Sequence, residues 1–324
     1  MTRVRSLLSI MAVMLLPAVA LAGDDEPTPA VAKKPAEPPT PAGASRAEIK
    51  RMFGFVPAFL NAVPDNALPG AWEEMKTVQM NPSTALPPKI KELIGLAVSA
   101  QVPCKYCVYA HTQFAKLHGA SDAEVKEAVM VAAQARHWST MAQGLQMDLK
   151  LFRAEIAKVI AHAKQSAGKP PPAAIQVVDA RSAMQDMQQT LGYVPEFLRK
   201  FPAEGIAGAW KEMRDVVMSP ATAIPAKYKT LIGIAVASQI PCRYCLAADG
   251  EFAKLEGTTE REVIEAVAMA AITRHWSTYL NGVETDEAQF KRDVDRMVKA
   301  AKKQAGAAKQ PVAAAPTARP AAAQ

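Results

Sequence analysis

The chain has 324 residues and a formal net charge of +7, and half of its residues are hydrophobic. This composition excludes a wholly disordered chain, and no stretch after the first 22 residues is apolar enough to cross a bilayer. The positive charge comes partly from the N-terminal segment and from Lys-rich linkers, without a DNA-binding motif, so we expect no nucleic-acid partner.

The first 22 residues have the pattern of a secretory signal peptide. Arg3 and Arg5 precede an apolar run that ends at Ala22, directly before Gly23. The alternative is an uncleaved membrane anchor, but the run is short against the roughly 20 residues that a span needs, and Pro17 interrupts it. We therefore expect a periplasmic protein whose mature chain begins at about Gly23, in a compartment where cysteine pairs oxidise readily.

Two halves of the chain repeat each other in register. Trp72 and Trp210, like Cys104 and Cys242, are 138 residues apart, and the same offset holds from about residue 52 to 282. The chain shows no alternating strand pattern, which predicts an all-α fold. Pro- and Ala-rich segments flank and separate the halves. The predicted organisation is a signal peptide at 1–22, a disordered linker at 23–44, repeat 1 at 45–163, a linker at 164–174, repeat 2 at 175–304 and a disordered tail at 305–324.

Each repeat marks its longest helix in the same way. Ser121 and Thr259 each precede a Glu by three residues, which predicts a capping box at the helix start. Gly119 and Gly257 stand where the preceding helix needs left-handed backbone to end. The apolar segment 89–101 is hydrophobic on nearly every face, more than one bundle of roughly 120 residues can cover. Burial between the halves or between subunits is therefore expected.

The reactive groups lie just after this apolar segment. Pro103 suits the first position of a new helix, which puts Cys104 and Cys107 one turn apart and His111 one turn further on. Unpaired N–H groups in a first helical turn favour thiolate over thiol. If the two helices fold back at about residue 102, Glu92 and His111 lie roughly 15 and 13 Å from the bend, and therefore level. A thiol, a base and an orienting carboxylate form the pattern of covalent catalysis.

A Glu twelve residues before a Cys-x-x-Cys, with a His four residues after it, resembles the AhpD-like (alkylhydroperoxidase D) branch of the carboxymuconolactone decarboxylase superfamily. The resemblance implies two tandem all-helical bundles, with Cys107 as the peroxidatic cysteine and Cys104 as the resolving one. It also implies that Glu92 and His111 relay protons. One departure is Tyr106, which stands where the family often has a second His.

The activity that this resemblance implies is that of an exported thiol-dependent peroxidase. Its substrate would be a hydroperoxide, and its reductant a dithiol or a thioredoxin-like partner. The resemblance also implies a homo-oligomer, with a trimer as the simplest assembly of fused repeats. Three alternatives stay open: a periplasmic thiol–disulfide oxidoreductase, a carboxymuconolactone-decarboxylase-like enzyme and a non-catalytic helical scaffold.

The second repeat keeps the thiols and loses the base. Cys242 and Cys245 are present, but Thr230 replaces Glu92 and Asp249 replaces His111. An ionised Asp one turn below Cys245 disfavours its thiolate. The sequence therefore predicts one competent site per chain and one degenerate pair, which is a possible second redox couple, a stabilising disulfide or a relic.

Other interpretations of the cysteines and histidines are weaker. A structural disulfide across so small a loop removes little entropy from the unfolded chain. A four-cysteine zinc site conflicts with the equivalent position of both pairs in separate bundles, and covalent haem needs a His directly after the second Cys, so we expect neither metal nor cofactor. His137 and His275 lie in runs that both repeats share, which favours packing, capping or subunit contacts over catalysis. His118 and His162 lie in polar surroundings and are expected to be solvated.

Overall fold

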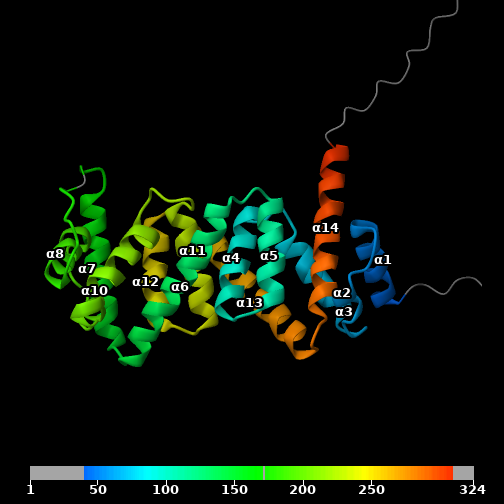
Figure 1. Ribbon diagram of the computed structural model, residues 1–324, viewed down its shortest axis with the longest axis horizontal. Coiled ribbons are helices and arrows are strands. Elements are labelled where there is room, and N and C mark those ends of the chain that lie inside the picture. Colours follow the sequence, from blue (N-terminus) through cyan, green and yellow to red (C-terminus); the bar gives the residue numbers. More distant parts are fainter. Residues whose placement is uncertain (1–39, 171, 309–324) are drawn as a thin grey trace, which may run out of the picture. The chain divides into compact units, whose positions relative to one another are not determined.

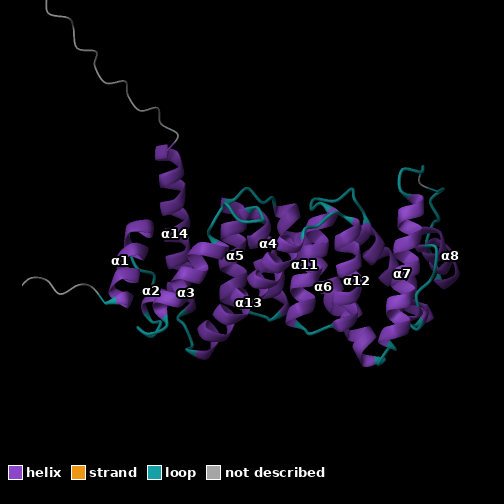
Figure 2. Cartoon of the chain, turned by 180° about the vertical axis from the view of Figure 1, so that it is seen from behind, coloured by secondary structure: helices purple, strands orange, loops and turns teal. Residues whose placement is uncertain are grey.

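A computed structural model describes residues 40–170 and 172–308. Within these ranges there are fourteen α-helices, two π-helical segments and no strand, which confirms the predicted all-α class (Figure 2). The predicted signal peptide at 1–22 lies outside the described residues, as does most of the linker predicted at 23–44. Of the helices that are described, none has the length and apolar character needed to cross a membrane.

The two repeats consist of the same eight elements in the same order. The elements of repeat 1 are α1 (Pro41–Phe53), α2 (Ala58–Asn61), α3 (Leu68–Glu74), η1 (Met75–Gln79), α4 (Pro88–Gln101), α5 (Lys105–Leu117), α6 (Asp122–Gly144) and α7 (Leu149–Ser166). Those of repeat 2 are α8 (Ala180–Leu191), α9 (Glu196–Arg199), α10 (Ala203–Glu212), η2 (Met213–Met218), α11 (Ala226–Gln239), α12 (Arg243–Leu255), α13 (Glu260–Gly282) and α14 (Glu287–Ala308).

Local sequence signals set the ends of the long helices. The capping boxes predicted at Ser121 and Thr259 are both formed, with each hydroxyl and its partner Glu bonding across the first turn of α6 or α13. Gly119 and Gly257 have φ of 84° and 70°, the left-handed conformation predicted for them. Each of these signals depends on residues that are close together in the chain, so the sequence alone predicts these helix ends.

Two helices extend into stretches for which disorder was predicted. Helix α1 begins at Pro41, inside the predicted linker, because the Thr40 side chain caps it and proline suits a first helical turn. Helix α14 continues to Ala308, a few residues into the predicted tail. The remaining repeat and linker boundaries stay predictions.

The last two helices of each repeat are exchanged or shared with the other repeat. Helix α7 packs on α12 and α8 of repeat 2, and α14 packs on α5, α1 and α2 of repeat 1 (Figure 1). Helices α6 and α13 lie between the repeats, because α6 packs on α4 and on α11, and α13 packs on α11 and on α4. We call α1–α5 with α13 and α14 the first cluster, and α6–α12 the second cluster. Each cluster therefore contains helices from both repeats. The sequence predicted the duplication but not this exchange.

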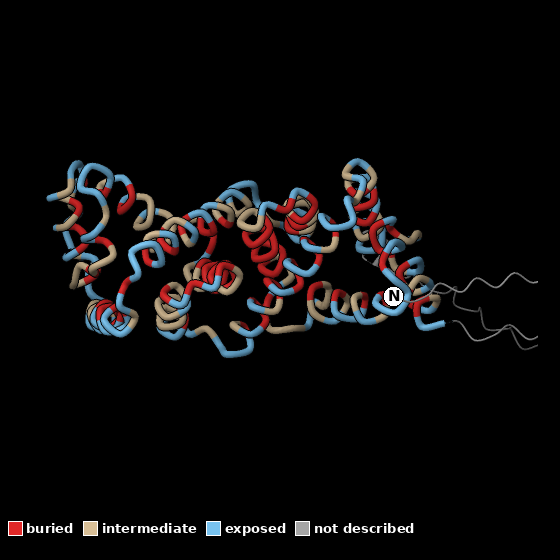
Figure 3. Tube along the Cα trace, turned by 90° about the horizontal axis from the view of Figure 1, so that it is seen from below, coloured by how far each residue is buried: buried red, intermediate tan, exposed pale blue. Residues whose placement is uncertain are grey.

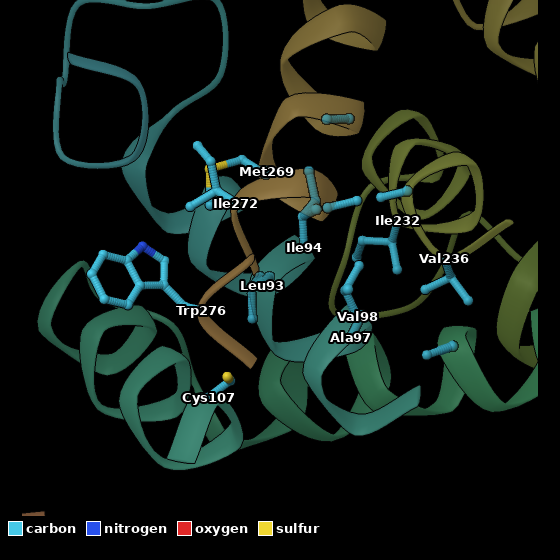
Figure 4. Packing of buried hydrophobic residues seen from close by; sticks show 14 of the residues in the cluster. Leu93, Ile94, Ala97, Val98, Cys107, Ile232, Val236, Met269, Ile272 and Trp276 are labelled. Carbon is cyan, nitrogen blue, oxygen red and sulfur yellow. The ribbon is translucent and has the colours of Figure 1, made fainter. Parts of the chain in front are cut away.

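Helices α4 and α11 lie against each other where the two clusters meet. Figure 4 shows Ala97 and Val98 of α4 close to Ile232 and Val236 of α11, while Met269 of α13 lies next to Ile272. Buried residues occur along the whole described chain (Figure 3), and they make up ten of the 14 residues of α4 and eight of the 14 of α11. The apolar segment of each repeat thus finds part of its cover in the other repeat, which confirms the expected burial between the halves.

A buried lysine ties each repeat to the other. Lys91 on α4 is fully buried, and its ammonium group lies 3.6 Å from the carboxylate of Glu265 on α13. It also donates hydrogen bonds to the carbonyls of Val78 and Asn81 and to the hydroxyl of Thr84, at 2.7, 2.6 and 2.9 Å. Burial lowers the pKa of Lys91, and the charge of Glu265 opposes that shift. The lysine therefore depends on a partner from repeat 2 to hold its charge.

The same contact occurs a second time with the roles of the repeats reversed. Lys229 on α11 lies 3.7 Å from Glu127 on α6. The acid also caps a loop in each case: Glu265 accepts hydrogen bonds from the backbone N–H groups of Ala85 and Leu86 at 2.7 and 3.2 Å. These reciprocal contacts fix the exchanged helices in place.

We expect Glu265→Ala to lower the free energy of unfolding by about 2–3 kcal/mol, because buried donors on Lys91, Ala85 and Leu86 lose an acceptor. Urea denaturation measures this loss. The exposed Arg261 on the same helix provides the control, since Arg261→Ala should change stability by no more than about 0.5 kcal/mol. Equal unfolding midpoints for both variants would show that the contact between repeats does not stabilise the fold.

Candidate active site

The first cysteine caps the helix that carries the site. Cys104 is the N-cap of α5, which begins at Lys105, so the prediction that Pro103 is the first helical residue is wrong. The reason is a hydrogen bond from the N–H of Cys104 back to the carbonyl of Ser99 on α4, which keeps this residue in the turn. The Cys104 sulfur accepts a hydrogen bond from the N–H of Cys107 at 3.2 Å. Both sulfurs thus lie in the first turn of α5.

All four cysteines form disulfides within their own motifs. Cys104 pairs with Cys107, and Cys242 pairs with Cys245, with Cα–Cα distances of 5.3 and 5.4 Å. Cys242 caps α12 in the way that Cys104 caps α5. The first-turn positions and the pairing are therefore the same in the two repeats.

The α4–α5 hairpin brings the predicted acid and base into contact. The Nδ1 atom of His111 lies 2.7 Å from Oε2 of Glu92, and both side chains are buried. Gln79 donates a hydrogen bond to the other carboxylate oxygen at 3.1 Å. Thr273 places its hydroxyl 3.4 Å from Nε2 of His111. The two groups meet as the helical rise predicted, and two further side chains hold them.

Gln79 and Thr273 were missed by the sequence analysis. Gln79 belongs to the π-helical segment η1, a form in which helices often carry functional residues. Thr273 comes from α13 of repeat 2, so its neighbourhood depends on the helix exchange. The sequence did contain a signal for these two residues. In the other repeat, Val217 stands at the position of Gln79 and Ala135 at the position of Thr273. Gln79 and Thr273 are polar beside Glu92 and His111, whereas the equivalent positions near the second cysteine pair are apolar. This difference between the repeats marks the site.

Gly95 on α4 makes room for the imidazole ring. A Cβ atom added to Gly95 would lie 2.7 Å from Nε2 of His111 and nearer still to its Cε1 and Nδ1 atoms. The ring therefore lies directly on the backbone of α4. A glycine at this position is a condition for the contact between His111 and Glu92.

Cys107, His111 and Glu92 line one cavity of about 190 Å³ in the first cluster. Its other walls are largely apolar and include Trp276 of α13 and Phe290 of α14. The cavity is thus completed by both repeats.

Cys104 does not line this cavity. It borders an outer hollow of about 520 Å³, whose rim includes Lys105, Glu287 and Lys291. Hydrogen bonds from Lys105 and Lys291 lower the pKa of Glu287 to about 2. The two cysteines of one disulfide therefore border different spaces.

A second cavity of about 340 Å³ lies in the second cluster, lined by Cys245, Asp249 and Thr230. A Cβ atom added to Gly233 would lie 2.7 Å from Oδ2 of Asp249, so this carboxyl group presses on α11 as His111 presses on α4. The structure therefore gathers the substituted residues around a cavity of their own.

The acids at this second cavity are not ordinary carboxylates. Burial, reinforced by the charge of Glu256, raises the pKa of Asp249 from 3.8 to about 7. Burial also raises the pKa of Glu256, while Thr230 and Lys229 oppose that shift. An ionised Asp249 was expected to disfavour the thiolate of Cys245, and near neutral pH a large share of Asp249 is protonated.

The model of the carboxymuconolactone decarboxylase family matches residues 66–147 and 204–285. The chain belongs to this family. The two matched segments contain both cysteine pairs together with Glu92 and His111, which confirms the tandem duplication and the resemblance drawn from the sequence. No curated protein and no solved structure matches the chain.

The other histidines of this family member have different surroundings. His137 stacks on Phe201 at 5.5 Å between ring centroids, which supports the packing role predicted for it. Neither His137 nor His275 is among the described residues that line the two cavities. His118 is exposed, as expected, but it lies on the wall of the first cavity. His162 is half-buried against Gly192 rather than fully solvated.

We expect Gly95→Ala to displace the His111 ring and to destabilise the fold by about 1–3 kcal/mol, because the added methyl group overlaps the imidazole. Urea denaturation measures the loss, and the ring resonances of His111 in nuclear magnetic resonance spectra report the displacement. Gly208→Ala is the matched control, because Gly208 is an exposed helical glycine with open space around it. An unchanged His111 spectrum in Gly95→Ala would contradict the close contact.

Asp249 gives a pH-dependent prediction. A carboxyl group with a pKa raised to about 7 contributes stability below its unfolded value of 3.8, and this contribution is lost as the pH rises through 7. Asp249→Asn should therefore match the native chain at pH near 4 and exceed its stability at pH near 8 by about 2–3 kcal/mol.

The measurement is the unfolding free energy across this pH range. Asp122→Asn serves as a control of opposite sign, because a hydrogen bond from Lys116 lowers the pKa of Asp122. A gain for Asp249→Asn that is equal at both pH values would rule out the raised pKa.

Proposed function

We propose that the first cluster reduces hydroperoxides with the Cys104–Cys107 pair. The observation that carries this proposal is the 2.7 Å contact between Glu92 and His111 on the wall of the cavity that Cys107 also lines. Cys107 and His111 are one turn apart on α5, so the base and the thiol share a face of the helix.

The surroundings of His111 support a role as a base. A carboxylate at Nδ1 favours the tautomer that carries its proton there, which leaves Nε2 free to accept one. The hydroxyl of Thr273 lies 3.4 Å from Nε2 and already donates a hydrogen bond to the carbonyl of Met269 at 2.7 Å. The lone pair of Nε2 is therefore available to the Cys107 thiol.

In the proposed cycle, His111 takes the proton of the Cys107 thiol, and the thiolate attacks the outer oxygen of the hydroperoxide. The O–O bond breaks, Cys107 becomes a sulfenic acid, and the leaving alkoxide receives the proton from His111 as an alcohol or as water. The Cys104 thiol then condenses with the sulfenic acid, forming the disulfide and releasing water. Two electrons pass from the thiols to the peroxide.

The two cavities support separate access for substrate and reductant. Cys107 lines the inner cavity of about 190 Å³, which suits a small hydroperoxide. Cys104 borders the outer hollow of about 520 Å³ but is itself fully buried, so an external dithiol or a thioredoxin-like protein reaches the disulfide from this side when the first turn of α5 opens. We also propose that this cycle takes place after export to the periplasm.

The outer hollow supports a second candidate, thiol–disulfide exchange with proteins. A partner cysteine that reaches Cys104 needs no access to the inner cavity. Fast oxidation of the reduced pair by protein disulfides, with slow oxidation by peroxide, would favour exchange over peroxide reduction.

We expect Cys107→Ser to abolish hydroperoxide consumption by the first cluster, and His111→Gln and Glu92→Gln each to lower it about 10²-fold or more. Turnover of hydrogen peroxide with dithiothreitol as reductant is measured in a Cys242→Ser/Cys245→Ser background, which isolates the first pair. Lys116→Gln, at an exposed position on α5, is the control and should leave turnover unchanged. Full turnover in the Cys107→Ser variant would remove the mechanism.

A further inference from the structure

The second cluster keeps the framework of a thiol site. Cys245 occupies the same first-turn position as Cys107, and it lines a cavity that is larger than the first, at about 340 Å³ against about 190 Å³. A site that had only decayed would be expected to fill with side chains, because interiors pack closely. The open cavity beside a preserved cysteine pair calls for another explanation.

Every acid–base group of the first site other than its cysteine is replaced by a different residue at this cavity. The polar residues of the first site are Gln79, Glu92, His111, His118 and Thr273, and the residues 138 positions away are Val217, Thr230, Asp249, Glu256 and Ala135. The imidazole and its carboxylate are gone, and two carboxyl groups have replaced the two histidines. The second site is thus rebuilt around carboxylic acids.

We propose that the second cluster is a second thiol site, in which the carboxylic acid of Asp249 exchanges the proton with Cys245 and the substrate is an apolar organic hydroperoxide. This inference rests on the proposed function of the first site and extends it to a second centre with a different proton carrier and a larger substrate.

The position of Asp249 fits this role. Asp249 and Cys245 are one turn apart on α12, and both line the second cavity. The absence of a side chain at Gly233 lets the carboxyl group lie on the backbone of α11, where a Cβ atom would come within 2.7 Å of Oδ2. Asp249 and Cys245 therefore share one face of α12 and one cavity, as His111 and Cys107 share a face of α5 and the first cavity.

Burial, with the charge of Glu256 adding to it, leaves a large share of Asp249 protonated near neutral pH. The other titratable groups on the described cavity wall are Lys229, Tyr244 and Glu256, in addition to Cys245. Three oxygens bind the ammonium of Lys229 at 2.6 to 2.8 Å, and Glu127 of α6 lies 3.7 Å from it.

The Tyr244 hydroxyl donates its hydrogen bond to the carbonyl of Met147. Desolvation then raises the pKa of Asp249 to about 7, near the optimum for a group that both accepts and donates a proton. A protonated Asp249 also removes the repulsion that an anion would exert on a thiolate.

The lining of the cavity indicates the substrate. Aromatic side chains cover much of the wall, from Trp138 and Phe152 of the exchanged helices to Phe197 and Phe252 of repeat 2. Among the described groups, Oε2 of Glu256 is buried without a hydrogen-bond partner, and Glu256 lines the same cavity. A ligand with an apolar body and one polar end would fill the space and satisfy this oxygen.

The proposed reaction balances with an external dithiol as reductant. The Asp249 carboxylate takes the proton of the Cys245 thiol, the thiolate attacks the outer oxygen of the hydroperoxide, and the O–O bond breaks. The alkoxide takes the proton from Asp249 and leaves as an alcohol, while Cys245 becomes a sulfenic acid. The Cys242 thiol condenses with it to give the disulfide and water. The dithiol then reduces the disulfide and is itself oxidised to a disulfide.

The test uses the full chain with Cys104→Ser and Cys107→Ser, so that only the second pair can react. The protein is reduced and mixed with cumene hydroperoxide or hydrogen peroxide, and disulfide formation between Cys242 and Cys245 is followed by mass spectrometry. We expect oxidation by cumene hydroperoxide at least about tenfold faster than by hydrogen peroxide. We also expect Asp249→Asn to slow it by about 10²-fold and to remove an inflection near pH 7 from the rate profile.

The controls separate this inference from the proposed function. Glu251→Gln on the same helix should leave the rate unchanged, and Asp249→Glu should keep the inflection even if its rate falls. A pair that reacts no faster than a free thiol, or a rate and pH profile unchanged by Asp249→Asn, would overturn the second site. The complementary Cys242→Ser/Cys245→Ser chain reports on the first site alone, so failure of the first site is recognised separately.

Discussion

The contact between Glu92 and His111 depends on how closely α5 approaches α4. Gly95 allows the imidazole ring to lie on the α4 backbone, where any Cβ atom would overlap it. At that distance the ring nitrogen reaches the Glu92 carboxylate at 2.7 Å, and the buried carboxylate is held in turn by Gln79. The proposed chemistry at Cys107 therefore requires α4 and α5 to lie close together, which the absence of a side chain at Gly95 allows.

The exchange of helices between the repeats provides the side chains that surround Glu92 and His111. Helices α13 and α14 of repeat 2 close the first cavity, and α6 and α7 of repeat 1 close the second. Lys91 with Glu265, and Lys229 with Glu127, tie the exchanged parts together. Neither repeat holds a complete cavity by itself, so the duplication produces two sites that each need both halves of the chain. The sites then differ only in the side chains that each repeat contributes.

Much of the first site could be predicted from the sequence, because its central contact lies within one helical hairpin. Counting the helical rise from the bend was enough to place Glu92 beside His111. The helix exchange was not predictable, since an apolar face shows that it is buried but not which helix covers it. Gln79 was missed because a π-helical segment shifts the register, and the protonation of Asp249 depends on a cavity that only the packed structure shows.

The central claim is that His111, held by Glu92, takes the proton of Cys107. The most direct measurement is the rate at which iodoacetamide alkylates Cys107 at pH 7 in the reduced chain with Cys242→Ser and Cys245→Ser. The account predicts that His111→Gln and Glu92→Gln each slow this reaction by about tenfold, because less of the thiol is present as thiolate. Alkylation at the same rate in all three proteins would contradict it.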